Sequence, residues 1–103
     1  IRAGIECLLS RAGVTAEEVA TVYLAGGFGT HLSPESATAI GMLPRCLKSK
    51  TVPLGNAALQ GACMLASNPA LQEKCRSIAA KAIHVELGGS EEFNQAFVEH
   101  MLF

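Results

Sequence analysis

The protein has 103 residues, of which 50% are hydrophobic and 17% are charged, and its formal net charge is −1. This composition excludes a disordered chain, and without a basic cluster we expect no nucleic acid and no membrane surface as a partner. The sequence has no run of about 18 apolar residues and no signal-peptide pattern, so we expect a cytoplasmic protein. Its length fits a single domain over residues 1–103.

Four cysteines lie far apart in the sequence, at Cys7, Cys46, Cys63 and Cys75. None belongs to a Cys-x-x-Cys motif or to a spacing that would hold zinc or an iron–sulfur cluster. No two of the three histidines lie at helical spacing from one another. We therefore expect reduced, mostly buried thiols and no metal site.

The first predicted element is an amphipathic helix over residues 1–12, which Gly13 ends as a C-cap. Its apolar positions repeat with helical spacing, but no N-cap residue precedes it. The chain begins at Ile1 instead of methionine. We therefore expect a C-terminal fragment of a longer protein.

A short apolar strand is predicted next, followed by a glycine turn, over residues 21–29. Thr15 and Glu18 have the spacing of a capping box, which predicts one helical turn before the strand. The continuous apolar run at residues 22–24 is typical of a strand buried on both faces. Gly26 and Gly27 have no Cβ, so the chain can turn sharply there and a ligand can approach the backbone. The strand lies between helices, in an αβα unit.

This glycine turn does not match the two best-known nucleotide fingerprints. The third glycine of a Rossmann motif would fall at Leu32, and no Gly-Lys-Ser/Thr follows for a P-loop. From the residues alone, a tight strand-to-helix turn and a ligand site remain equal alternatives.

The remaining elements follow from caps, prolines and periodicity. Ser33 and Pro34 predict a helix to about residue 40, and small residues in a later helix predict that it packs very close to the strand or its neighbour. The expected series is a loop at 41–49, an extended segment at 50–54, helices at 55–66 and 69–82, a half-exposed strand at 83–87, and a C-terminal helix at 90–102. The fold class is therefore α/β, with a small central sheet flanked by helices.

Two segments together, residues 22–29 and 52–62, resemble the end of an actin-like ATPase domain of the acetate and sugar kinase, heat-shock chaperone and actin superfamily. In that ribonuclease H-like fold, a strand ending in Gly-Gly forms the adenosine motif and a later Gly-x-Ala helix packs beside it. More narrowly, nearly the whole chain resembles the C-terminal domain of the reductive activators of corrinoid proteins. The segments that carry this resemblance are 1–6, 23–29, 33–37 and 52–58.

The resemblance implies an ATP-binding part of an iron–sulfur protein. Members of that family carry a ferredoxin domain with a 2Fe-2S cluster, and they use ATP with Mg to reduce a Co(II) corrinoid to Co(I) for methyl transfer. It also implies a nucleotide site whose adenosine side is lined by Gly26, Gly27 and Phe28, with Gly55 and Asn56 at the start of the supporting helix. No catalytic residue carries over, so we expect no ATP hydrolysis by the fragment itself and no cofactor bound to it.

The expected partners are the rest of the parent chain and a corrinoid protein, and a homodimer stays open. One alternative is a non-catalytic interaction or dimerisation module, in which Phe93, Phe97 and Phe103 form the contact surface. Another is an actin-like small-molecule kinase, which differs by an upstream substrate domain in place of a ferredoxin.

Overall fold

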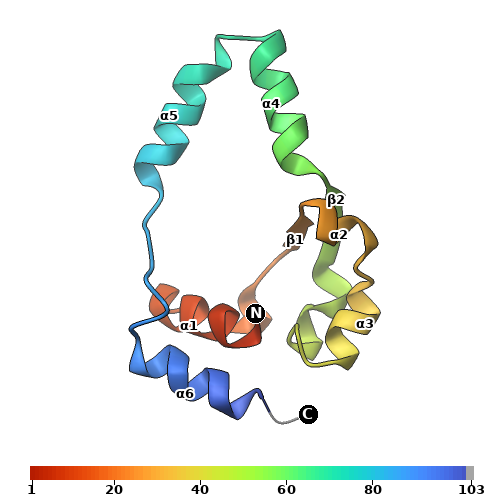
Figure 1. Cartoon of the computed structure of the whole chain (residues 1–103), viewed down its shortest axis with the longest axis vertical. Coiled ribbons are helices and arrows are strands. Elements are labelled where there is room, and N and C mark those ends of the chain that lie inside the picture. Colours follow the sequence, from red (N-terminus) through yellow and green to blue (C-terminus); the bar gives the residue numbers. More distant parts are fainter. Residues whose placement is uncertain (102–103) are drawn as a thin grey trace.

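The computed structural model describes residues 1–101, except for the side chain of Phe28, and has a mixed α/β architecture with a small parallel sheet flanked by helices (Figure 1). Its elements are α1 (Arg2–Ala12), η1 (Ala16–Glu18), β1 (Val22–Ala25), α2 (Gly27–His31), α3 (Pro34–Ala39), η2 (Arg45–Lys50), β2 (Thr51–Gly55), α4 (Ala57–Ser67), α5 (Leu71–Lys81) and α6 (Glu91–Glu99).

Short-range capping patterns formed as the sequence predicts. Gly13 ends α1 in the left-handed conformation, and its amide and that of the next residue bond back to the last turn. Thr15 and Glu18 form the capping box of η1. The hydroxyl oxygen of Ser33 accepts a hydrogen bond from a backbone amide in the first turn of α3, as predicted. Ser90 does the same at the start of α6, where no cap was expected from the sequence. Within residues 1–101, no helix has the length and apolarity needed to span a lipid bilayer.

The sheet consists of β1 and β2, which run parallel with Val22 opposite Thr51 and Ala25 opposite Gly55. The prediction of a strand buried on both faces is wrong for this chain. Exposure alternates along β1, and the Tyr23 side chain is 63% exposed. The continuous apolar run therefore has more hydrophobic surface than the rest of the described chain covers.

The buried hydrophobic side chains come from α1 and from the segment that runs from α3 to η2. Ala3 and Cys7 of α1 are buried where α6 packs against this helix. Ala37 of α3 and Leu47 of η2 are buried together with Leu43 between them. Residues 41–49, expected as a loop, include most of the 3₁₀ helix η2, in which Leu47 is buried.

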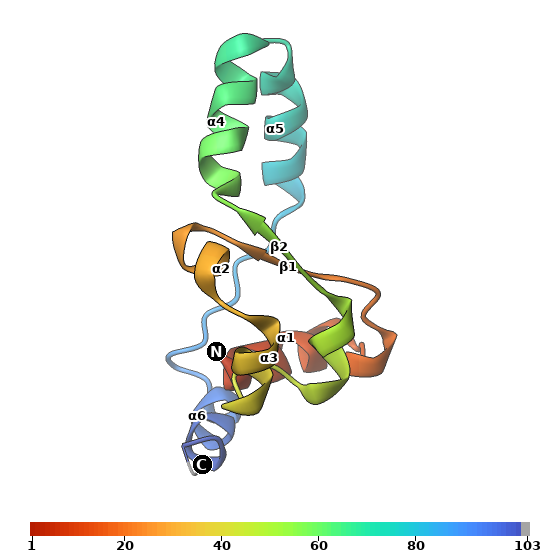
Figure 2. The ribbon, with the colours of Figure 1, turned by 90° about the vertical axis from the view of Figure 1, so that its right-hand side faces the viewer.

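The second half of the chain departs most from the sequence-based expectations. Helices α4 and α5 form a hairpin that projects away from the α1–α6 pair (Figures 1 and 2). The helix predicted at 55–66 runs from Ala57 to Ser67, and it contains no buried residue in the described structure. The expectation that its small residues pack tightly against the strands is therefore wrong for this chain.

Three segments of the second half also differ from the sequence-based expectations. The helix expected from residue 69 begins at Leu71, because residues 68–70 form a turn in which the Asn68 side chain accepts from the Ala70 amide. Residues 83–87 are extended but pair with no strand within the described chain, so the predicted strand is wrong. The C-terminal helix, expected at 90–102, ends at Glu99, and residue 102 lies outside the described residues.

Candidate functional site

The two glycine turns meet at one edge of the sheet. Because β1 and β2 are parallel, their carboxyl ends lie side by side, with Ala25 opposite Gly55. The backbone N–H of Gly26 donates a hydrogen bond to the carbonyl oxygen of Gly55 at 2.8 Å. The structure thereby brings the two halves of the expected site, residues 26–28 and 55–56, to a common edge (Figure 2). Open α/β sheets bind their ligands at such edges.

Gly26 and Gly55 both have backbone conformations that favour glycine, with φ of 98° and 68°. Gly27 differs, because it is the first residue of α2 and its φ is not positive. A Cβ added at Gly27 would have no neighbouring heavy atom within 4 Å. Gly27 is therefore required neither by backbone conformation nor by packing within the described chain, and it leaves open space where the turn enters α2.

Asn56 has a local role at this edge. Its side-chain Oδ1 accepts a hydrogen bond from the backbone amide of Leu59 at 3.0 Å, which makes it the N-cap of α4. Phe28 is the second residue of α2, and its side chain lies outside the described part of the structure. The expected site residues are thus all on the two turns, and Asn56 holds the start of the second helix.

Thr30 also belongs to this edge, although we did not identify it from the sequence. Its hydroxyl donates to the carbonyl oxygen of Gly26 at 3.3 Å, and Oγ1 would be 3.8 Å from a Cβ built on Gly55. The sequence feature that could have identified it is a threonine four residues after Gly26. In a helix, a threonine hydroxyl can donate to the carbonyl four residues before it. Thr30 therefore lies close to both turns and is hydrogen-bonded to the first.

Gly29 sets how closely α2 packs on β1. A Cβ at this position would lie 3.1 Å from the carbonyl carbon and oxygen of Leu24, closer than ordinary van der Waals contact. The three glycines of the turn therefore have different roles. Gly26 adopts a positive φ, Gly29 allows α2 to pack closely on β1, and Gly27 leaves open space beside the turn. None of the residues from Gly26 to Thr30 is charged, so this edge can form a wall for a ligand but supplies no acid or base.

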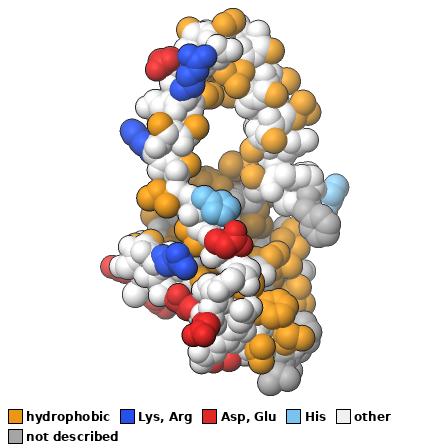
Figure 3. All heavy atoms as spheres, turned by 60° about the vertical axis from the view of Figure 1, so that its left-hand side comes forward, with side chains coloured by type: hydrophobic (Ala, Val, Ile, Leu, Met, Phe, Trp, Pro, Cys, Tyr) orange, Lys and Arg blue, Asp and Glu red, His pale blue; other side chains and the backbone are white. Residues whose placement is uncertain are grey.

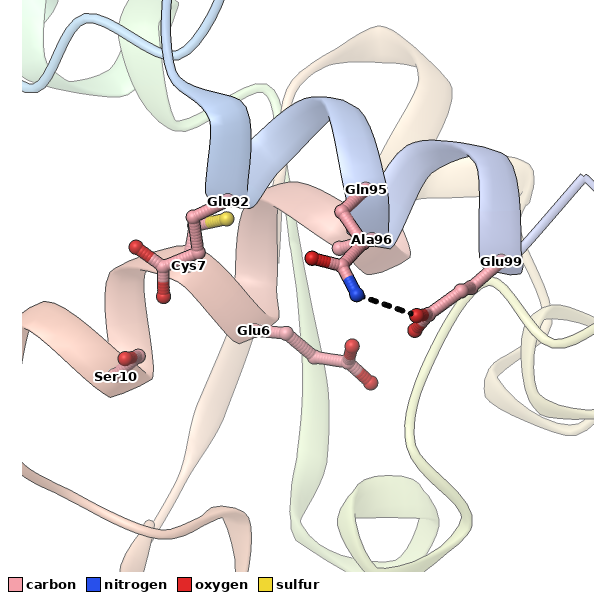
Figure 4. Close-up of a pocket in the computed structure, with 7 residues that line it drawn as sticks. All are labelled: Glu6, Cys7, Ser10, Glu92, Gln95, Ala96 and Glu99. Carbon is pink, nitrogen blue, oxygen red and sulfur yellow. Dashed lines mark hydrogen bonds between the residues drawn. The ribbon is translucent and has the colours of Figure 1, made fainter.

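A hollow lies between α1 and α6, with a volume of about 260 Å³ (Figure 4). Glu6 and Glu99 extend toward one another in it, and Glu92 lies at its other end beside Cys7. Gln95 donates to Glu99 at 3.2 Å. No cationic side chain lines this hollow, so its electrostatics do not suit a phosphate-bearing ligand.

Glu6 instead serves to hold α1 and α6 together. Its carboxylate lies 2.6 Å from Nε of Arg2 and 2.7 Å from Nε2 of His100. Partial burial alone would raise the pKa of Glu6, but the hydrogen bonds with His100 and Arg2, together with their charges, hold this pKa below its ordinary value. The contact joins two residues near opposite ends of the described chain.

The cysteines do not form a site. Cys7 is buried, and burial raises the pKa of its thiol, which keeps it protonated. The expectation that the thiols are mostly buried is wrong, because Cys46, Cys63 and Cys75 are exposed. Among residues 1–101, no three side chains of His, Cys, Asp or Glu are grouped closely enough to hold a metal ion.

Comparison with known proteins identifies the family. The model of the C-terminal domain of RACo, the ASKHA domain, matches residues 1–103. The chain is also 26% identical over 98 residues to the corrinoid activation enzyme RamQ of Eubacterium limosum. The aligned region covers 94% of this chain but only 16% of that relative. No solved structure matches the chain significantly. The resemblance seen in the sequence is thus confirmed, and the chain belongs to the family of the RACo C-terminal, actin-like ASKHA domain.

Proposed function

We propose that this chain is the C-terminal part of the ATP-binding domain of a cytoplasmic iron–sulfur protein. The whole protein would use ATP to drive the reduction of a Co(II) corrinoid protein to Co(I). Support comes from the family match over the full chain and from the similarity to a relative named as a corrinoid activation enzyme. The chain spans 16% of that relative, so the activity belongs to a much longer polypeptide.

The observation that carries the nucleotide proposal is the hydrogen bond between Gly26 and Gly55. It fixes two turns, each with bare backbone, at the carboxyl edge of parallel strands. A planar base and ribose can lie against such a surface because no Cβ projects from Gly26, Gly27 or Gly55. We therefore assign the adenosine side of the site to Gly26, Gly27, Phe28, Gly55 and Asn56.

The rest of the ATP chemistry is assigned to other parts of the protein. ATP with Mg would supply the free energy for an uphill electron transfer, and this chain's residues would bind and orient the adenosine end. The described residues contain no cluster of metal ligands for Mg. The four cysteines also do not fit a 2Fe-2S cluster, because Cys7 is buried in one helix interface while the other three are exposed on separate elements. We place the cluster on a separate domain.

Calorimetric titration of Mg-ATP into the intact protein tests this proposal, with Gly27→Val as the variant. A Cβ at residue 27 meets no heavy atom within 4 Å in the described structure, so we expect the variant to fold. It should bind Mg-ATP at least about tenfold more weakly if the turn faces the nucleotide. Thr38→Val, on α3 away from the edge, is the control and should bind normally. A folded wild-type protein that takes up no nucleotide would exclude the ATP-binding function.

A dimerisation module remains the second candidate, because α6 presents exposed aromatic surface. The rings of Phe93 and Phe97 stack with centroids 5.9 Å apart, and Phe97 is 49% exposed. Phe103 lies outside the described residues. A Phe97→Glu variant that turns a dimeric parent into a monomer would support this function. The small-molecule kinase alternative is tested by reading the parent gene for a substrate domain.

A further inference from the structure

The two strands, the glycine turns and the helices that follow them lie in uncharged stretches of the chain. Residues 19–34 and 51–72 contain no Asp, Glu, Lys or Arg. Figure 3 shows hydrophobic side chains on the α4–α5 hairpin, around an opening above the α1–α6 pair. A side chain from these stretches that restrains the glycine turns must therefore act by packing or by a hydrogen bond, without an ion pair.

Strand pairing restrains the two turns only weakly. The register shifts between Leu24 and Ala25, and Leu54 of β2 is opposite no residue of β1. Beyond this irregularity lie Gly26 and Gly55, which have the backbone freedom of glycine and positive φ. The hydrogen bond from the Gly26 amide to the Gly55 carbonyl joins them. The part of the sheet assigned to the ligand therefore needs a restraint besides the strand pairing.

Thr30 of α2 is placed to supply this restraint. Its hydroxyl donates to the carbonyl oxygen of Gly26 at 3.3 Å. Its Oγ1 would be 3.8 Å from a Cβ built on Gly55, and among the described residues other than the chain neighbours of Gly55 it is the one heavy atom within 4 Å of that position. Gly26 is thus held through its N–H by Gly55 and through its carbonyl oxygen by Thr30.

A threonine hydroxyl that donates to the carbonyl four residues before it is a common local contact, so the location of this one matters more than its type. Thr38 makes the same contact with Pro34 in α3, at 2.7 Å and in a less exposed place. The Thr30 contact differs because its acceptor is a turn glycine and because the second turn lies within reach. The carbonyl that it holds belongs to the peptide that leads into Gly27, where the open space for a ligand begins.

We infer that Thr30 is a positioning residue for the nucleotide edge. Its hydroxyl fixes the orientation of the peptide between Gly26 and Gly27, and its side chain sets the approach of the Gly55 turn. The two bare backbone surfaces then face one ligand. This inference rests on the proposed function and adds to it a residue outside the five assigned to the adenosine. Thr30 acts through the two turns, so its effect on the backbone can be measured without nucleotide.

Hydrogen exchange at the Gly26 amide of the intact protein, without nucleotide, is the first test. Thr30→Val removes the hydroxyl and keeps the branched shape of the side chain. We expect the Gly26 amide to exchange about three- to tenfold faster in this variant than in wild type, because the turn opens more often. Thr30→Ser keeps the donor and should exchange as wild type does, and so should the matched control Thr38→Val. Unchanged exchange in folded Thr30→Val would overturn the inference.

Calorimetric titration of the same intact variants is the second test, with Mg-ATP and Mg-ADP as the probes. Thr30→Val should bind both about three- to tenfold more weakly than wild type, since both contain the adenosine that the edge would hold. Thr30→Ser should restore the affinity. Thr38→Val loses a shorter hydrogen bond, so its melting temperature should fall at least as far, but it should bind normally. A loss of affinity without a larger loss of stability is the result that a merely structural threonine would not give.

The outcomes separate this inference from the proposed function. If wild type and Thr30→Val bind Mg-ATP equally well, the inference is overturned and ATP binding stands. If wild type binds neither nucleotide, the proposed function is excluded. Faster Gly26 exchange in Thr30→Val would in that case still support the role of Thr30 in holding the two turns. If Thr30→Ser binds as weakly as Thr30→Val, the hydroxyl is not the positioning group, and the inference is overturned.

Discussion

Gly26 donates its backbone N–H to the carbonyl oxygen of Gly55 at 2.8 Å, and both residues have positive φ. Two turns that belong to different strands are therefore fixed to one another through backbone atoms alone. Substitution of either glycine should therefore lower stability by straining the backbone. This loss of stability can be measured separately from a change in ligand affinity.

The contrast between Gly26 and Gly27 tests this separation. Gly26→Ala should destabilise the intact protein by about 1–2 kcal/mol, because alanine is strained at φ near 98°. Gly27→Ala should leave stability unchanged or slightly higher, because Gly27 is at a helical position with open space. Chemical denaturation followed by circular dichroism measures both. Equal losses would mean that Gly27 is also required for the backbone.

Gly29 should not accept a side chain. Gly29→Ala places a Cβ 3.1 Å from the Leu24 carbonyl group, so α2 must move away from β1, at a cost of about 1–3 kcal/mol. Gly61→Ala is the matched control, since a Cβ there meets no neighbour and alanine favours the interior of α4 by about 0.5–1 kcal/mol. Denaturant titration of the two variants should therefore give shifts of opposite sign.

Asn56 allows capping to be distinguished from ligand contact. Asn56→Ala should lose about 1 kcal/mol of stability, because the Leu59 amide loses its acceptor, whereas Asn56→Asp keeps an acceptor and should retain stability. The added negative charge of aspartate should weaken Mg-ATP binding if the nucleotide lies at this edge. Melting temperatures and calorimetric titration give the two readouts. Normal ATP affinity of Asn56→Asp would place the nucleotide away from α4.

The contact between α1 and α6 should depend on pH through Glu6. Because the pKa of Glu6 is lowered in the folded state, its contribution to stability is present above the unfolded pKa and is lost as the pH falls through the folded pKa. Wild type should therefore lose more stability than Glu6→Gln between about pH 5 and pH 3. Unfolding free energies measured across this range provide the check. Parallel curves would show that Glu6 is unperturbed in solution.

The sequence by itself determined the features that depend on near neighbours. The box of Thr15 and Glu18, the cap at Ser33 and the left-handed end at Gly13 are confirmed, because each requires atoms only a few residues apart. The family could also be recognised from the sequence, because its glycine turns are short, continuous motifs. The assignment of residues 26–28 and 55–56 to a nucleotide remains a prediction.

Tertiary structure decided which of these local elements meet. The register that sets Ala25 opposite Gly55, and with it the Gly26–Gly55 hydrogen bond and the position of Thr30, depends on pairing between strands distant in sequence. Residues 83–87 alternate as a strand does yet stay unpaired in the described chain. Periodicity encodes which face of a segment is apolar, but burial requires a partner surface, and only the fold supplies or withholds that partner.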